Sequence, residues 1–123
     1  MRRKGSHEGR KFVFDIIAHN DNETVIIDVK TILRPNDTKS FFEKLNHAKE
    51  WLAEYKTFNI YGAVAYLQAD SGSELFAENQ KLFVIKEMGN SAQIINKSDF
   101  QPSIFQITSL LFFYLLAILT SVL

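Results

Sequence analysis

The chain has 123 residues, which is enough for one domain with a single hydrophobic core and too few for two independent domains. Its 14 basic and 14 acidic residues cancel, so no chain-wide charge would attract nucleic acid or an anionic membrane. Because the chain has no cysteine, disulfides, thiolate metal clusters and a thiol nucleophile are excluded, and any catalytic site must use oxygen and nitrogen ligands.

The predicted elements begin after a basic N-terminal segment, residues 1–10. No apolar stretch typical of a secretory signal follows this segment, because Asp15 and the polar residues 20–23 come next. We therefore expect a cytoplasmic location.

Two short segments rich in Val, Ile and Phe come next, residues 11–18 and 23–32. The turn-forming residues Asn20, Asp21 and Asn22 separate them, which predicts a β-hairpin. After Pro35, apolar residues recur at helical spacing and predict an amphipathic helix over residues 39–56. The residues on its apolar face are Phe41, Leu45, Ala48, Leu52 and Tyr55.

Residues 58–67 form a nearly continuous apolar run, which is typical of a central strand covered on both faces. A short helix ending near Gln80 and strands at 82–86 and 92–96 complete the order β-β-α-β-α-β-β. A helix between strands implies a crossover connection. The predicted fold class is therefore α/β, with a mixed β-sheet flanked by helices and an apolar C-terminal helix.

Three charged residues interrupt the two apolar strands of the hairpin: Asp15, Asp28 and Lys30. Residues two apart on a strand share a face, which places Asp28 and Lys30 together. If the hairpin closes through Asp21 and Asn22, Asp15 lies directly opposite Asp28, with Cβ atoms about 5 Å apart. The three side chains would then converge on one patch.

Two carboxylates at this separation repel each other unless a cation lies between them or one of them is protonated. With oxygen ligands and no cysteine, Mg²⁺ or Mn²⁺ is favoured over zinc. Lys30 could then orient a water molecule or stabilise a phosphate, which suits metal-assisted phosphodiester hydrolysis. The alternative is a solvated face on which Lys30 forms a surface ion pair with the two carboxylates.

The hairpin resembles the core of the PD-(D/E)XK nuclease superfamily. The resemblance rests on F-D-I-I-A-H-N and V-I-I-D-V-K-T, and further on G-A-V-A-Y-L, A-E-N-Q-K-L-F-V-I and S-D-F-Q-P. It implies a restriction-endonuclease-like core over residues 11–103 that hydrolyses DNA. It also implies Asp15 and Asp28 as metal ligands, the Val29 carbonyl as a third ligand, and Lys30 as the catalytic lysine.

The chain departs from the superfamily pattern at three points. Phe14 replaces the proline of the motif, and Asp28 replaces the more common glutamate. The usual first helix and strand find no counterpart in residues 1–10, so the chain resembles an N-terminally truncated member, whose missing edges a homodimer partner would supply. A catalytically inactive or fragmentary protein of the same fold, acting as a nucleic-acid-binding or membrane-anchored module, is the alternative.

Five further polar residues are candidates for contacts with nucleic acid. Lys11, Arg34 and Lys44 could contact phosphates near the site, although a plain solvated surface would carry the same residues. Gln80 and Lys81 follow a predicted helix and precede a strand, where some nucleases of the superfamily place auxiliary polar residues.

The segment 104–123 contains no charged residue and includes the run L-L-F-F-Y-L-L-A-I-L. A membrane-spanning helix needs about 20 mostly apolar residues, so the segment is just long enough. Three interpretations remain open: a membrane anchor, a helix packed on a bare face of the sheet, and a non-homologous tail produced by a frame disruption.

Overall fold

The computed structural model describes residues 3–7 and 10–105 of the chain. Seven strands, three α-helices and one 3₁₀ helix are found there. In chain order they are β1 (Arg3–His7), β2 (Arg10–Phe14), β3 (Ile16–His19), β4 (Glu23–Leu33), α1 (Pro35–Asn46), α2 (Ala48–Trp51), η1 (Ala53–Tyr55), β5 (Asn59–Ala69), α3 (Ser73–Asn79), β6 (Phe83–Glu87) and β7 (Ala92–Ile94).

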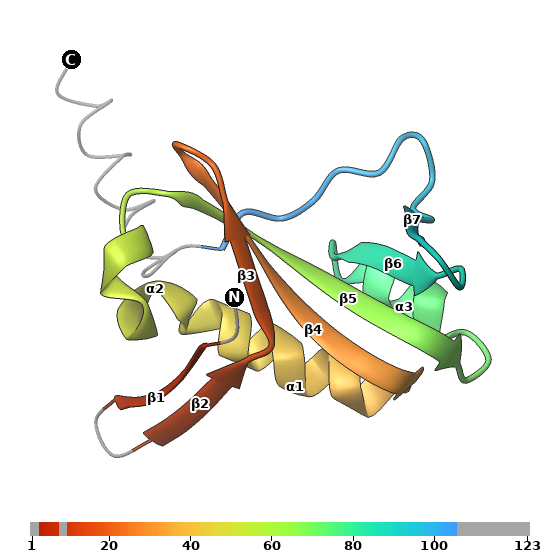
Figure 1. The fold of residues 1–123 in the computed structure, drawn as a ribbon, viewed down its shortest axis with the longest axis horizontal. Coiled ribbons are helices and arrows are strands. Elements are labelled where there is room, and N and C mark those ends of the chain that lie inside the picture. Colours follow the sequence, from red (N-terminus) through yellow and green to blue (C-terminus); the bar gives the residue numbers. More distant parts are fainter. Residues whose placement is uncertain (1–2, 8–9, 106–123) are drawn as a thin grey trace, which may run out of the picture.

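A mixed five-stranded sheet with the order β3-β4-β5-β6-β7 forms the centre of the molecule (Figure 1). The β3–β4 and β6–β7 pairs are antiparallel, whereas β4, β5 and β6 run parallel. The predicted α/β class with a mixed sheet is confirmed, and so is the central position of the apolar strand β5.

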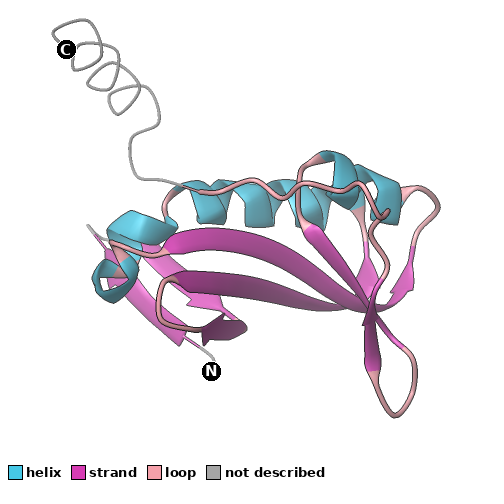
Figure 2. Cartoon of the chain, turned by 90° about the horizontal axis from the view of Figure 1, so that it is seen from above, coloured by secondary structure: helices cyan, strands magenta, loops and turns pink. Residues whose placement is uncertain are grey.

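Both crossover helices lie on the same face of the sheet (Figure 2). The connections β4–α1–β5 and β5–α3–β6 step across the sheet in the same direction. Two crossovers of the usual right hand that step in one direction place their helices on one face. The expectation that β5 is covered on both faces is therefore wrong for the described residues, since Leu67 on the other face is 48% exposed.

We call this second side of the sheet the open face. Side chains alternate between the two faces along each strand, and the register of the ladders defines the set that points away from the helices. The open face consists of Ile16, Ala18, Val25, Ile27, Val29, Thr31, Tyr61, Ala63, Ala65, Leu67, Phe83, Ile85 and Ile94.

The predicted helix 39–56 is divided into α1, α2 and η1, with interruptions at His47 and Leu52. The helix also begins earlier, because Pro35 occupies the first helical turn and the Arg34 N–H donates a hydrogen bond to Asp37 Oδ2. The chain keeps turning in the helical sense across both interruptions. The Trp51 N–H donates a hydrogen bond to the His47 carbonyl, and the Tyr55 N–H donates one to the Leu52 carbonyl. All five residues of the predicted apolar face are consequently buried.

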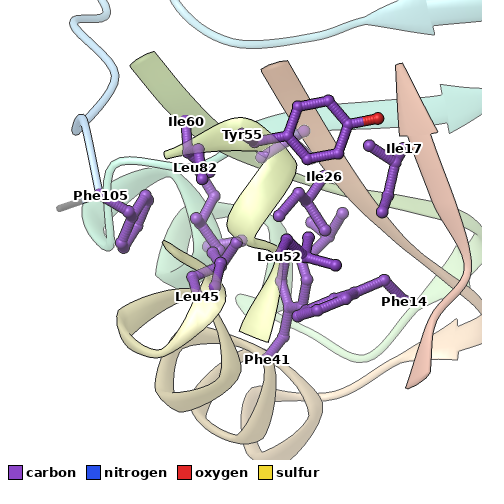
Figure 3. Close-up of a cluster of buried hydrophobic side chains, with 14 of the residues drawn as sticks. Phe14, Ile17, Ile26, Phe41, Leu45, Leu52, Tyr55, Ile60, Leu82 and Phe105 are labelled. Carbon is purple, nitrogen blue, oxygen red and sulfur yellow. The ribbon is translucent and has the colours of Figure 1, made fainter. Parts of the chain in front are cut away.

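The core lies between the helices and the covered face of the sheet, and Figure 3 shows its central part. Gly62 on β5 permits the closest approach of the two layers, because a Cβ atom there would clash with the side chains of Leu45 on α1 and Leu82. A larger residue at this position would push α1 away from the sheet.

The two ends of the described chain differ from the sequence-based expectation. Part of the basic N-terminal segment forms β1, which pairs with β2 in a separate antiparallel ribbon. At the other end, Phe105 forms an isolated bridge with Ile60 instead of belonging to a helix. Residues 106–123 of the predicted C-terminal helix lie outside the described residues. Within residues 3–7 and 10–105, no helix is long and apolar enough to cross a membrane.

Candidate metal centre at the β3–β4 hairpin

The β3–β4 hairpin has the predicted register. Ile16 pairs with Ile27 and His19 pairs with Thr24, so the ladder ends one residue before Asp15 and Asp28. The Asn20 side chain holds the turn, because its Oδ1 accepts hydrogen bonds from the N–H groups of Asn22 at 3.0 Å and Glu23 at 2.7 Å. This turn therefore fixes which residue of β4 lies opposite Asp15.

The predicted first strand is divided at Asp15, where the chain bends between β2 and β3. The β3–β4 ladder stops at Ile16, and β2 pairs with β1 instead of continuing along β4. From Asp28 onward, β4 consequently has no strand beside it on that edge within the described chain. The bend thus opens the edge of the sheet at the position of the two carboxylates.

Asp28 projects toward the helices and is only 8% exposed. Its Oδ2 is buried and accepts no hydrogen bond from the residues that the structure describes. A buried carboxylate oxygen without a hydrogen bond is costly, because its hydration is lost, and the ion pair with Lys30 at 3.7 Å compensates for this only in part. Asp28 is therefore placed at a position that stability alone does not explain.

Burial raises the pKa of Asp28 to about 6, from an ordinary value of 3.8. The Lys30 ammonium group lowers this pKa, while a hydrogen bond with the Asp15 carboxyl group and the negative charge of Asp15 raise it. Lys44 lowers it further. Around pH 6 Asp28 is therefore still partly protonated, and a cation could take the place of its proton.

Asp15 contacts β4 through the main chain, since its Oδ2 accepts a hydrogen bond of 3.0 Å from the Val29 N–H. In a strand, the N–H and C=O groups of one residue point to the same edge. The Val29 carbonyl therefore points to the same unpaired edge as its N–H. This placement is compatible with the predicted role of the Val29 carbonyl as a third ligand.

Two lysines supply positive charge beside the carboxylates. Lys30 follows Asp28 on the same face, and its Nζ lies 3.7 Å from Asp28 Oδ2, while its side chain remains 37% exposed. Lys44 is half-buried in the last turn of α1, and its charge reaches Asp28 from the helix layer. Among the predicted phosphate-binding residues whose side chains the structure describes, Lys44 acts electrostatically on Asp28.

The other predicted polar residues lie in different surroundings. Arg34 pairs with Asp70 at 3.4 Å, at the end of β4. Lys11 belongs to β2. Gln80 caps the C-terminus of α3, and Lys81 has a left-handed φ of 65° in the connection to β6, so β5 separates both from β4.

A buried tyrosine also borders the site. Tyr66 on β5 is in register with Lys30 and is 3% exposed. Burial raises its pKa to about 12, and Glu74 on α3 contributes in the same direction. The side chain therefore remains a neutral phenol beside Lys30. No local sequence signal could reveal this neighbour, because it depends on the pairing of β4 with β5.

These groups fit a hard divalent cation. Among the described residues, no three His, Asp or Glu side chains lie close enough to hold a metal ion. Two carboxylates with a main-chain carbonyl would therefore leave coordination positions for water or phosphate oxygens, which is the arrangement that Mg²⁺ commonly adopts in proteins. The buried Asp28 Oδ2, which accepts no hydrogen bond from the described residues, supports this fit.

Comparisons of the chain with protein families, with curated proteins and with solved structures find no match.

Proposed function

We propose that the chain is a metal-dependent, nuclease-like protein of the PD-(D/E)XK superfamily that hydrolyses DNA phosphodiester bonds with Mg²⁺ or Mn²⁺. The observation that carries the proposal is the convergence of Asp15, Asp28 and Lys30 at the unpaired edge of β4. One acidic residue beside the start of β3, with a second acidic residue and a lysine on β4, is similar to the pattern that the sequence motif predicts.

The fold supports the proposal in a more general way. Asp28 lies on β4 and Asp15 lies at the bend just before β3, which pairs antiparallel with β4, and the next two strands are parallel and connected by helices. A restriction-endonuclease-like core would have this arrangement around its site, so the sheet and the motif point to the same assignment.

In the proposed mechanism, Asp15, Asp28 and the Val29 carbonyl would hold the ion. The ion, when bound, would polarise a phosphate oxygen and activate a water molecule. Lys30 would place its ammonium group against the developing negative charge of the phosphate, since its side chain reaches solvent beside Asp28. Lys44 would add positive charge from α1, and the neutral Tyr66 phenol would close the site on the β5 side.

The test is cleavage of linear and supercoiled DNA by the full chain with Mg²⁺, Mn²⁺ or EDTA. We expect cleavage with either ion and none with EDTA. Lys30→Ala should lower the rate by about 100-fold or more, because groups that act on the transition state contribute this much.

Lys86→Ala is the matched control for Lys30→Ala. Lys86 lies on the same face of the sheet and in the same row, with Tyr66 between it and Lys30. The control should cleave at the wild-type rate. Equal activities of Lys30→Ala and the wild-type protein would refute the catalytic proposal, as would cleavage in EDTA.

A second candidate is a nucleic-acid-binding protein of the same fold without catalysis. The ion pair between Lys30 and Asp28 favours it, because this contact can neutralise the buried carboxylate without a metal ion. Such a protein would bind DNA equally well in Mg²⁺ and in EDTA and would leave it intact.

A further inference from the structure

The β1–β2 ribbon concentrates positive charge. Its two strands contain four basic residues and no acidic residue. The four are Arg3, Lys4, Arg10 and Lys11. Residues 15–105, which we call the body, contain 9 basic and 13 acidic residues instead. The zero net charge of the chain therefore combines a positive ribbon with a negative body.

The ribbon is attached directly to the candidate metal centre. Phe14, the last residue of β2, is 1% exposed, and its ring centroid lies 6.2 Å from that of Trp51 on α2, so the base of the ribbon is fixed in the core. Asp15 follows at the bend. Further out, Gly5 is exposed, and the ribbon extends away from the five-stranded sheet (Figure 1). A polyanion held by the ribbon would consequently lie beside Asp15.

The register divides the basic residues between the two faces of the ribbon. Residues two apart on a strand share a face, and so do residues directly opposite each other on paired strands. Lys4 and Lys11 are therefore on one face, together with Val13. Arg3 and Arg10 are on the other face. Each face of the ribbon thus carries two basic residues.

We infer that the β1–β2 ribbon binds duplex DNA by entering the major groove and pairing with phosphates on both of its sides. The major groove is about 12 Å wide and admits a two-stranded β-ribbon. With five residues in each strand, the ribbon is about 17 Å long at 3.4 Å per residue. Basic residues on both faces match a groove, because a groove has a phosphate backbone on each side.

The charge of the body explains why the ribbon is needed. Phosphate contacts supply most of the affinity of proteins for nucleic acid. The body is negative, and the candidate metal centre adds two carboxylates at the point where the substrate would lie. Attraction to DNA must therefore come from the ribbon. This inference rests on the proposed function, because it names duplex DNA as the substrate of that site.

Two other partners fit the ribbon less well. A flat anionic bilayer would meet only one of its faces, although lysines and arginines do bind anionic lipids. A second copy of the chain would offer its negative body, but nine basic residues are interspersed with the acidic residues there. A DNA backbone, in contrast, is uniformly negative.

The test is binding of a fluorescent DNA duplex to the full chain, measured by anisotropy in EDTA so that no cleavage is expected. The duplex has about 20 base pairs, and the salt concentration is varied from about 50 to 200 mM, because the dependence of affinity on salt reports the number of phosphate contacts. Lys4→Gln/Lys11→Gln should bind about 10-fold or more weakly at about 0.1 M salt, with the slope of log affinity against log salt reduced by about 2.

Two further variants separate the charge of the ribbon from its structure. Lys56→Gln/Lys97→Gln is the matched control, because it removes the same charge from two exposed positions of the body. It should bind with the wild-type affinity and slope. Lys4→Arg/Lys11→Arg keeps the charge of the ribbon and should keep the slope. Circular dichroism of each variant checks that the fold is retained.

Three outcomes would overturn the inference. The first is a wild-type chain that does not bind the duplex, or that binds it with the same affinity and slope as Lys4→Gln/Lys11→Gln. The second is tighter binding to the single strand of the same sequence. The third is binding to phosphatidylserine vesicles in place of the duplex, which would assign the ribbon to a membrane. Failure of the proposed function is seen separately, in the cleavage assay with Lys30→Ala, and leaves these binding results unchanged.

Discussion

At the scale of single residues, Asp28 is the side chain whose position is best explained by the proposed site and least explained by the stability of the fold. It is buried, one of its oxygens has no hydrogen-bond partner among the described residues, and Asp15 adds a second carboxylate beside it. A neutral residue would satisfy the core better. The metal-free protein is therefore expected to be less stable when Asp28 is ionised than when it is protonated.

The first prediction concerns Asp28→Asn in EDTA. The folded protein binds the Asp28 proton more tightly than the unfolded chain, with pKa values of about 6 and 3.8. The stability of the wild-type protein should therefore fall as the pH rises from about 4 to about 6. At about pH 7.5, Asp28→Asn should be more stable than the wild-type protein by up to roughly 3 kcal/mol, with little difference near pH 4.

Urea unfolding followed by Trp51 fluorescence at both pH values measures this difference. Asp21→Asn, in the exposed hairpin loop, is the control and should stay within about 0.5 kcal/mol of the wild-type protein. A destabilised Asp28→Asn at about pH 7.5 would show that the carboxylate is well compensated in the fold.

Residue types and spacing were sufficient to predict which acidic residues would meet. From the two-residue periodicity of strands and the turn at residues 20–22, Asp15 was predicted to lie opposite Asp28. The β3–β4 ladder has the register on which this prediction depends. Lys44 was expected near the site, but its effect on the pKa of Asp28 and the place of Tyr66 beside Lys30 could not be predicted, because they depend on how α1 and β5 pack against β4.

At the scale of elements, the position of α1 over the sheet depends on the absence of a side chain at Gly62. Leu45 from α1 and Leu82 occupy the space where a Cβ atom would lie. Since α1 also carries Lys44 toward Asp28, a displacement of this helix would change the charge around the carboxylates.

Gly62→Ala is expected to destabilise the protein by about 1–3 kcal/mol, which is typical of overpacking in a well-packed core. Chemical denaturation of Gly62→Ala, Leu45→Val and the double variant measures the coupling. The double variant should be less destabilised than the sum of the single variants, because Leu45→Val removes part of the clash. Strict additivity would contradict the close approach of α1 to β5.

The hairpin turn provides a second prediction at this scale. Asn20→Ala removes the acceptor for the N–H groups of Asn22 and Glu23 and should cost about 1 kcal/mol. Thermal unfolding measures this cost, with Asp21→Ala in the same loop as the matched control. If both variants have the stability of the wild-type protein, the Asn20 side chain does not hold the turn.

At the scale of the whole molecule, strands and helices were predictable because each has a clear apolar periodicity. The interruptions of the predicted helix 39–56 were not, because Phe41 to Tyr55 keep helical spacing across them. The coverage of the sheet was not predictable either, since an apolar run such as β5 does not reveal which of its faces is occupied. Both crossover helices lie on one side of the sheet (Figure 2), and residues 3–7 and 10–105 leave the other side open.

The central claim is that Asp15 and Asp28 hold a divalent cation, and calorimetric titration of Mn²⁺ into the full chain at about pH 7.5 tests it most directly. We predict binding of a single ion, weakened by about 10-fold or more in Asp15→Asn and in Asp28→Asn. Asp21→Asn and Asp70→Asn should bind as the wild-type protein does. No binding at millimolar Mn²⁺, or unchanged binding by Asp28→Asn, would contradict the account.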